Sequence, residues 1–159
     1  MLKKTIALIA ALSLGSGTLT AQQNGVRHVA PQGAIKPTAT WGLATRAGDF
    51  LFIAGMRGID PRTDSLVSGD EARIRQAFQN MKHIAESEGV GLKDAVRLIV
   101  YVTDMYRYRP IINKVQAELW SGGPYPPRTI LEVQRLNQDY IAKIEGTFYA
   151  PPLPRLPRR

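Results

Sequence analysis

The chain contains no cysteine and only two histidines, His28 and His83. Without cysteine it has no disulfide, no thiolate metal ligand and no site for a lipid anchor on sulfur. A zinc or iron site would depend almost wholly on carboxylates, which is unusual for these metals. One histidine lies in a polar N-terminal segment and the other in an expected helix, so a Ser-His-Asp triad has little to work with. We expect any catalysis to need no cofactor and no metal.

Further absences argue against nucleotide and nucleic-acid binding. Gly89 and Gly91 lack the third glycine of a dinucleotide loop and follow an expected helix, so they indicate a helix stop. The net charge of +8 falls to +6 without Lys3 and Lys4, with 19 basic and 13 acidic residues left. Removing the three arginines of the last five residues leaves about +3, interleaved with acids. We therefore expect no nucleic-acid partner.

The N-terminus has the organisation of an export signal. Lys3 and Lys4 form its positive start, Ile6 to Leu14 its apolar stretch, and Leu19 to Ala21 a cleavage site. The apolar stretch is far shorter than the roughly 20 residues that cross a bilayer. We expect residues 1–21 to be removed, which leaves a periplasmic or secreted protein without membrane attachment. An uncleaved N-terminal anchor or a mobile tail is the alternative.

The rest of the chain has the size and the 44% hydrophobic content of one soluble domain. Residues 22–36 are polar and predict a loose leader, and residues 37–150 predict the domain. Residues 151–159 are rich in proline and arginine, which predicts a disordered tail. A polyproline recognition segment and a solubilising tail are both open for it.

The hydrophobic pattern of the domain predicts the order strand, helix, strand, helix, strand, strand. Ser68 and Glu71 have capping-box spacing, and apolar residues then recur at helical spacing as far as Ala85. The predicted strands cover residues 50–55, 95–102, 129–133 and 140–149, and the second helix covers 109–120. A sheet with both helices on one face satisfies this order, so we expect an α+β fold.

Arg128 stands between two prolines and a predicted strand. Pro126 and Pro127 can neither continue a helix nor pair centrally in a sheet, so they form a rigid start to the strand. A guanidinium held there is a two-pronged donor suited to a carboxylate. Arg128 is therefore a candidate ligand-binding residue, and a surface arginine is the alternative.

Four different segments of the domain together form one pattern, which is specific in the order and the spacing of the segments. They are FIAGM at 52–56, QAFQNM at 76–81, VYVTDM at 100–105 with Asn113 beyond it, and PPRTILEV at 126–133 followed by Ile144 and Glu145. The pattern resembles the RidA/YjgF/UK114 family, also called the L-PSP endoribonuclease-like family. The resemblance implies a chorismate-mutase-like fold and a homotrimer with a ligand pocket at each subunit interface. Its best-known branch hydrolyses 2-imino or 2-enamino acids to 2-keto acids and ammonia.

The resemblance also implies site residues. Arg128 matches the family arginine that pairs with the substrate carboxylate. Counting back from Gly55, Trp41 stands where the family has an aromatic residue that would cover the substrate. Backbone groups near Gly55 and Ile130 would polarise the imine. Asn113 would shape the site, and a structural helix residue is the alternative for it.

Other positions depart from the family pattern. The family acid that holds the attacking water is replaced by Lys143, found by counting on from Arg128. A charged lysine cannot accept a proton, but a desolvated one could, or it could bind a second anionic group. Glu145 shares a strand face with Lys143, so it supplies the acid if the register shifts by two, and otherwise forms a weak ion pair. The pocket suits a carboxylate with an apolar or aromatic body.

Three hypotheses of function follow. The first is an exported RidA-like trimer that binds a small carboxylate through Arg128 and hydrolyses imines, with Glu145 as the acid. The second is a non-catalytic ligand-binding or chaperone-like trimer, which the loss of the family acid favours. The third is a ribonuclease, which ranks last because no histidine is placed as a general base.

Overall fold

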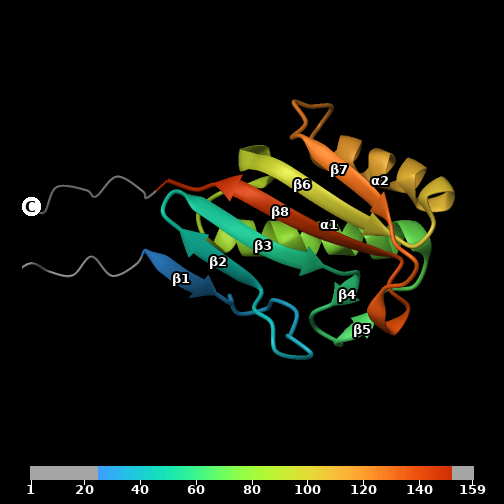
Figure 1. Cartoon of the computed structure of the whole chain (residues 1–159), viewed down its shortest axis with the longest axis horizontal. Helices are drawn as coiled ribbons and strands as arrows, with labels where there is room; N and C mark the ends of the chain where they lie inside the picture. Colours follow the sequence, from blue (N-terminus) through green and yellow to red (C-terminus); the bar gives the residue numbers. More distant parts are fainter. Residues whose placement is uncertain (1–24, 152–159) are drawn as a thin grey trace, which may run out of the picture.

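The computed structural model describes residues 25–151 of the chain. They form a six-stranded sheet in the order β1-β2-β3-β8-β6-β7, with both long helices on one face and the other face open (Figure 1). This arrangement confirms the expected α+β class. The expected export signal at 1–21 lies outside the described residues, as does the expected tail at 151–159 apart from its first residue. No helix within 25–151 is both long and apolar enough to cross a membrane.

Most neighbouring strands of the sheet are antiparallel, and β6 and β7 are the parallel pair. The sheet strands are β1 (Val26–Val29), β2 (Ala44–Ala47), β3 (Phe50–Met56), β6 (Ala95–Val102), β7 (Arg128–Glu132) and β8 (Ala142–Tyr149). The helices are α1 (Asp70–Ser87) and α2 (Met105–Leu119), and a hairpin joins β4 (Ile59–Asp60) to β5 (Ser65–Leu66).

The core lies between the sheet and the helices. Residues of β8 alternate between buried and partly exposed, as a strand with one covered face requires. Gly146 lets α1 approach β8 closely, because a Cβ there would lie 2.8 Å from Sδ of Met81 and 2.6 Å from the ring of Phe148. Phe78 and Trp120 meet edge to face at 6.0 Å between α1 and the end of α2. This packing holds the sheet that carries the candidate site.

Three expectations about local structure were wrong. Val26–Val29, expected in a loose leader, pairs with β2, because backbone hydrogen bonds at a sheet edge do not need an apolar composition. The capping box does not form: Gly69 has a φ of 86°, and α1 begins after it without a side-chain cap. Helix α2 begins at Met105, one turn earlier than predicted, because Oδ1 of Asp104 accepts a hydrogen bond from the N–H of Arg107.

Candidate functional site

The structure divides the predicted site residues between the two faces of the sheet. Arg128 of β7 pairs with Leu98 of β6, whose side chain is buried beneath the helices. Glu145 of β8 pairs with Ile99, the next residue along β6, and therefore points to the opposite face. One chain thus presents two separate groups of candidate residues.

Arg128 is held by the side-chain amides of helix α2. Its Nη1 donates to Oε1 of Gln116 at 2.5 Å, and its Nη2 donates to Oδ1 of Asn113 at 2.6 Å. Burial, and then the nearby Arg109 guanidinium, lower the pKa of Arg128 from its ordinary value, but an arginine stays charged at neutral pH. No ion pair in the described part of the chain includes Arg128. A fixed guanidinium without a counter-charge can receive a ligand carboxylate.

Two hollows border Arg128. One, of about 390 Å³, is lined by Asn113, Gln116, Ala117, Tyr125, Pro126 and Arg128. The other, of about 340 Å³, is lined by Met105, Arg109, Arg128 and Ile130. Asn113 and Ile130, two of the candidate residues, thus line hollows beside the arginine. Gln116 was missed, although its spacing of three from Asn113 on one helix face could have identified it.

The second group lines a larger pocket, of about 840 Å³, at the end of β3. Four predicted residues border it: Trp41, Gly55, Lys143 and Glu145. Segments far apart in the sequence enclose it, namely residues 38–41, the end of β3, residues 135–140 and β8. Arg57 and Tyr140 also line this pocket and were not selected from the sequence.

A β-bulge shapes the floor of this pocket. The register between β3 and β8 shifts by one residue, so Ala54 and Gly55 oppose the single residue Glu145. The stem of Lys143 lies across the bulge, because a Cβ on Gly55 would be only 2.4 Å from Cε of Lys143. Glycine at this position leaves room for the lysine to lie flat.

Lys143 and Glu145 reach the same pocket without pairing. No ion pair joins them within residues 25–151, so the expected local ion pair does not form. Tyr101 lies two residues along β6 from Ile99, the partner of Glu145, and therefore shares the sheet face of Glu145. Burial first, and then the charge of Glu145, raise the pKa of the Tyr101 phenol. Among residues 25–151, Glu145 is a carboxylate on the open face that makes no ion pair.

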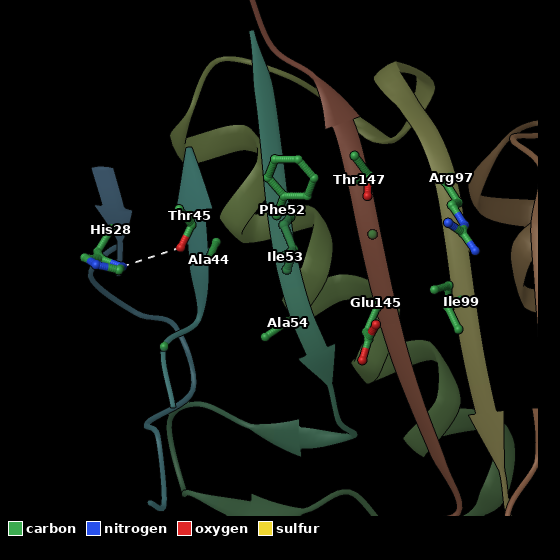
Figure 2. Close-up of a pocket in the computed structure, with 12 residues that line it drawn as sticks. His28, Ala44, Thr45, Phe52, Ile53, Ala54, Arg97, Ile99, Glu145 and Thr147 are labelled. Atoms are coloured by element: carbon green, nitrogen blue, oxygen red, sulfur yellow. Dashed lines mark hydrogen bonds between the residues drawn. The ribbon is translucent and has the colours of Figure 1, made fainter. Parts of the chain in front are cut away.

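Glu145 also borders a hollow of about 420 Å³ on the open face (Figure 2). Figure 2 shows Phe52 of β3 and Arg97 of β6 on either side of the strand that carries Glu145. His28 lies at the far rim, where its Nδ1 is 3.4 Å from Oγ1 of Thr45. The carboxylate of Glu145 is the one ionisable group that lines both this hollow and the larger pocket.

The two groups supply guanidinium, ammonium, amide and carboxylate functions. Among residues 25–151 no three histidine, aspartate or glutamate side chains gather as metal ligands. The arrangement can bind an anion and can move a proton at Glu145.

Comparison with known proteins identifies the family. The profile of the family described as Endoribonuclease L-PSP matches residues 31–150. The chain belongs to this family. A solved structure of a probable translation initiation inhibitor from Rhodopseudomonas palustris is 54% identical, with a TM-score of 0.77 over 80% of this chain and 99% of that one.

Two further relatives of this chain support the assignment to the L-PSP family. A RutC family protein of Pyrococcus horikoshii is 40% identical over 119 residues, 74% of this chain and 93% of its own length. A 2-iminobutanoate/2-iminopropanoate deaminase of Dermatophagoides farinae is 31% identical over 116 residues, 71% of this chain and 88% of its own length. The family predicted from four sequence segments is thus confirmed, and β1 lies ahead of the matched residues.

Proposed function

We propose that this L-PSP family protein binds a small 2-imino or 2-enamino carboxylate and hydrolyses it to a 2-keto acid and ammonia. The observation that carries the proposal is Arg128, a guanidinium fixed by the amides of Asn113 and Gln116 with no acidic partner in the described residues. Such a group can take a substrate carboxylate in two parallel hydrogen bonds. The relative named as an iminobutanoate deaminase supports the reaction class.

In this reaction a water molecule adds to the carbon of the C=N bond. As the water oxygen bonds to carbon, one water proton passes to Glu145, and Glu145 returns it to the nitrogen, which becomes an amine. Glu145 then takes the proton of the new hydroxyl and gives it to the amine, the C–N bond breaks, and ammonia leaves as the C=O bond of the ketone forms. Glu145 is the carboxylate among the residues that line the larger pocket, so we assign the proton transfers to it.

The complete site requires a second copy of the chain. Arg128 and Glu145 lie on opposite faces of one sheet, so one chain cannot offer both to a small molecule. We propose a homotrimer in which the Arg128 group of one copy meets the larger pocket of the next. Exposed aromatic side chains on the open face, Phe50, Phe52 and Tyr149, offer an apolar surface for such an assembly.

A second candidate is a trimer that binds a carboxylate without turnover. Lys143 favours it, because this cation stands where the family resemblance places the acid that holds the attacking water, and its stem is packed across Gly55. In that case Glu145 has no catalytic role.

The test is ammonia release from enzymatically generated 2-imino acids. We expect the protein to accelerate release, and Glu145→Gln to lose about 100-fold or more, as removal of a general acid-base group does. Arg62→Ala is the matched surface control, because Arg62 is 86% exposed and pairs with Asp60. Equal rates for wild type and Glu145→Gln would remove the carboxylate from the mechanism. No acceleration by wild type, with carboxylate binding intact, would favour the second candidate.

A further inference from the structure

Arg57 is a buried guanidinium that lies between two aromatic rings. Its relative exposure is 4%. Its Cζ lies 4.6 Å from the ring centroid of Trp41 and 5.1 Å from that of Tyr140. The rings attract the positive charge, but they accept none of the hydrogen bonds that the edge of the guanidinium donates.

The polar edge of Arg57 is almost without partners. Nη2 donates to the carbonyl of Lys36 at 3.5 Å, the long limit for a hydrogen bond. Nε is sealed from solvent and makes no hydrogen bond in the described structure. Nη1 also makes none there but is not sealed, and the residue lines the 840 Å³ pocket. The donors that remain available therefore face a space large enough for a small molecule.

Buried guanidiniums usually pair with carboxylates. Arg46, whose side chain is 15% exposed, follows this rule and contacts Glu88 at 3.1 Å. Arg57 does not: no carboxylate pairs with it within residues 25–151. Burial lowers the pKa of Arg57, and Tyr140 and Asp64 offset this only in part, yet an arginine remains protonated at neutral pH. An anion is the partner that this charge lacks.

The same pocket has an excess of positive charge. Arg135 and Lys143 line it with Arg57, and Glu145 is the one carboxylate among its lining residues. None of these three cations takes part in an ion pair within the described residues. The pocket thus favours a ligand with negative charge.

The backbone that carries Arg57 is clamped to helix α1. Nδ2 of Asn80 donates to the carbonyls of Arg57 and Ile59, both at 2.8 Å. Gln76 fixes the amide of Asn80 in turn through a hydrogen bond of 2.9 Å. The guanidinium is therefore positioned before any ligand arrives, which reduces the cost of binding.

We propose that Arg57 and Lys143 form a second anion subsite, which binds a distal carboxylate of the substrate. The preferred substrate is then a 2-imino dicarboxylate, with its first carboxylate on Arg128 of a neighbouring copy. This inference rests on the proposed function for the role of Arg128. Of the two roles that the sequence left open for Lys143, proton acceptor and anion-binding group, this proposal assigns the second. It also gives the substrate a second carboxylate in place of the apolar or aromatic body expected from the sequence.

Calorimetric titration of the full chain with stable keto-acid probes tests the subsite. The probes are 2-oxoglutarate, with two carboxylates, and 2-oxobutanoate, with one. We expect wild type to bind the dicarboxylate at least about tenfold more tightly, as one charge-assisted hydrogen-bonded contact allows. In Arg57→Leu we expect this ratio to fall close to one. A ratio measured within one variant does not depend on how much of the sample is folded.

Two more variants keep the test decisive. Lys143→Met retains the stem across Gly55 and removes the charge, so its ratio should lie between wild type and Arg57→Leu. Arg62→Ala removes an exposed guanidinium that does not line the pocket and should keep the wild-type ratio. If Arg57→Leu does not fold, the affinity ratio of Lys143→Met alone tests whether the subsite exists. A wild-type ratio of one, or a ratio unchanged by loss of Arg57 or Lys143, would overturn the subsite.

The subsite and the reaction can fail separately. A dicarboxylate preference that depends on Arg57, without ammonia release from any imine, would keep the subsite and reject the hydrolysis. Ammonia release without any dicarboxylate preference would keep the hydrolysis and reject the subsite.

Discussion

At the end of helix α1 the arginines form ion pairs with a glutamate. At the candidate site the arginines of the described residues form no ion pair. Glu88, whose side chain is 8% exposed, receives Arg27 and Arg46. Arg57 and Arg128 are held instead by aromatic rings and neutral amides. A guanidinium that is paired with a carboxylate inside the fold stabilises the fold, and little of its charge remains available to a ligand. One that is held by neutral groups keeps its charge available.

Removing the carboxylate of Glu88 should lower the stability of the fold. Glu88→Gln leaves Arg46 partly buried without a counter-charge, so we expect a loss of about 2 kcal/mol in the free energy of unfolding. Urea unfolding of the full chain measures it. The control is Glu86→Gln, since Glu86 is 55% exposed and contacts Lys82 at 3.5 Å. That exposed pair should matter by no more than about 0.5 kcal/mol. Equal losses for both variants would contradict the comparison.

The same acid should make stability depend on pH. Burial alone would raise the pKa of Glu88, but hydrogen bonds from Arg27 and Arg46 outweigh it and lower the pKa below its ordinary value of 4.5. The stabilisation is therefore complete above pH 4.5 and is lost as the pH falls through the lowered value. Urea midpoints from neutral to acidic pH should fall more in wild type than in Glu88→Gln. Parallel curves would show that Glu88 is not the group responsible.

At the candidate site, replacement of the side-chain amide of Gln116 should reduce activity more than it reduces stability. Gln116→Leu removes one hydrogen bond to Arg128 at a position that is 4% exposed, with a side chain of similar size. We expect kcat/KM for ammonia release to fall about tenfold, because Arg128 is then oriented by Asn113 alone. Unchanged kinetics with a large fall in melting temperature would show that Gln116 is only a core residue.

The smallest effect should come from the bulge under Lys143. In Gly55→Ala the new Cβ overlaps Cε of Lys143, a flexible side chain that can move aside. We expect a loss of about 1 kcal/mol or less in the free energy of unfolding. The displaced ammonium should also weaken the preference for 2-oxoglutarate over 2-oxobutanoate. A preference equal to that of wild type would show that the resting position of Lys143 does not matter.

The sequence predicted those parts of the fold that depend on local patterns. The strand at 95–102 was found at the residues predicted, because its apolar run is short and rich in β-branched residues. Helix α1 ends at Ser87, just before Gly89, which has a φ of 78°. Strand β1 was missed because an edge strand is held by backbone hydrogen bonds that composition does not record.

The candidate site was predicted only in part, for a different reason. Arg128 and Asn113 were identified, and the structure brings them into contact. Arg57 was missed because its environment comes from Trp41 and Tyr140, which a local pattern cannot bring together. The division of the site between two sheet faces was missed as well, since it depends on the register of β6 with its two neighbours.

The most direct test compares ammonia release by Arg128→Ala and Arg46→Ala at a temperature where both variants remain folded. We predict that Arg128→Ala loses at least about tenfold in kcat/KM, because its substrate carboxylate has no charged partner. We predict that Arg46→Ala, which removes a guanidinium already matched by Glu88, keeps the wild-type value and melts at a lower temperature. Equal activity in the two variants would contradict the assignment of Arg128 as the residue left free for a ligand.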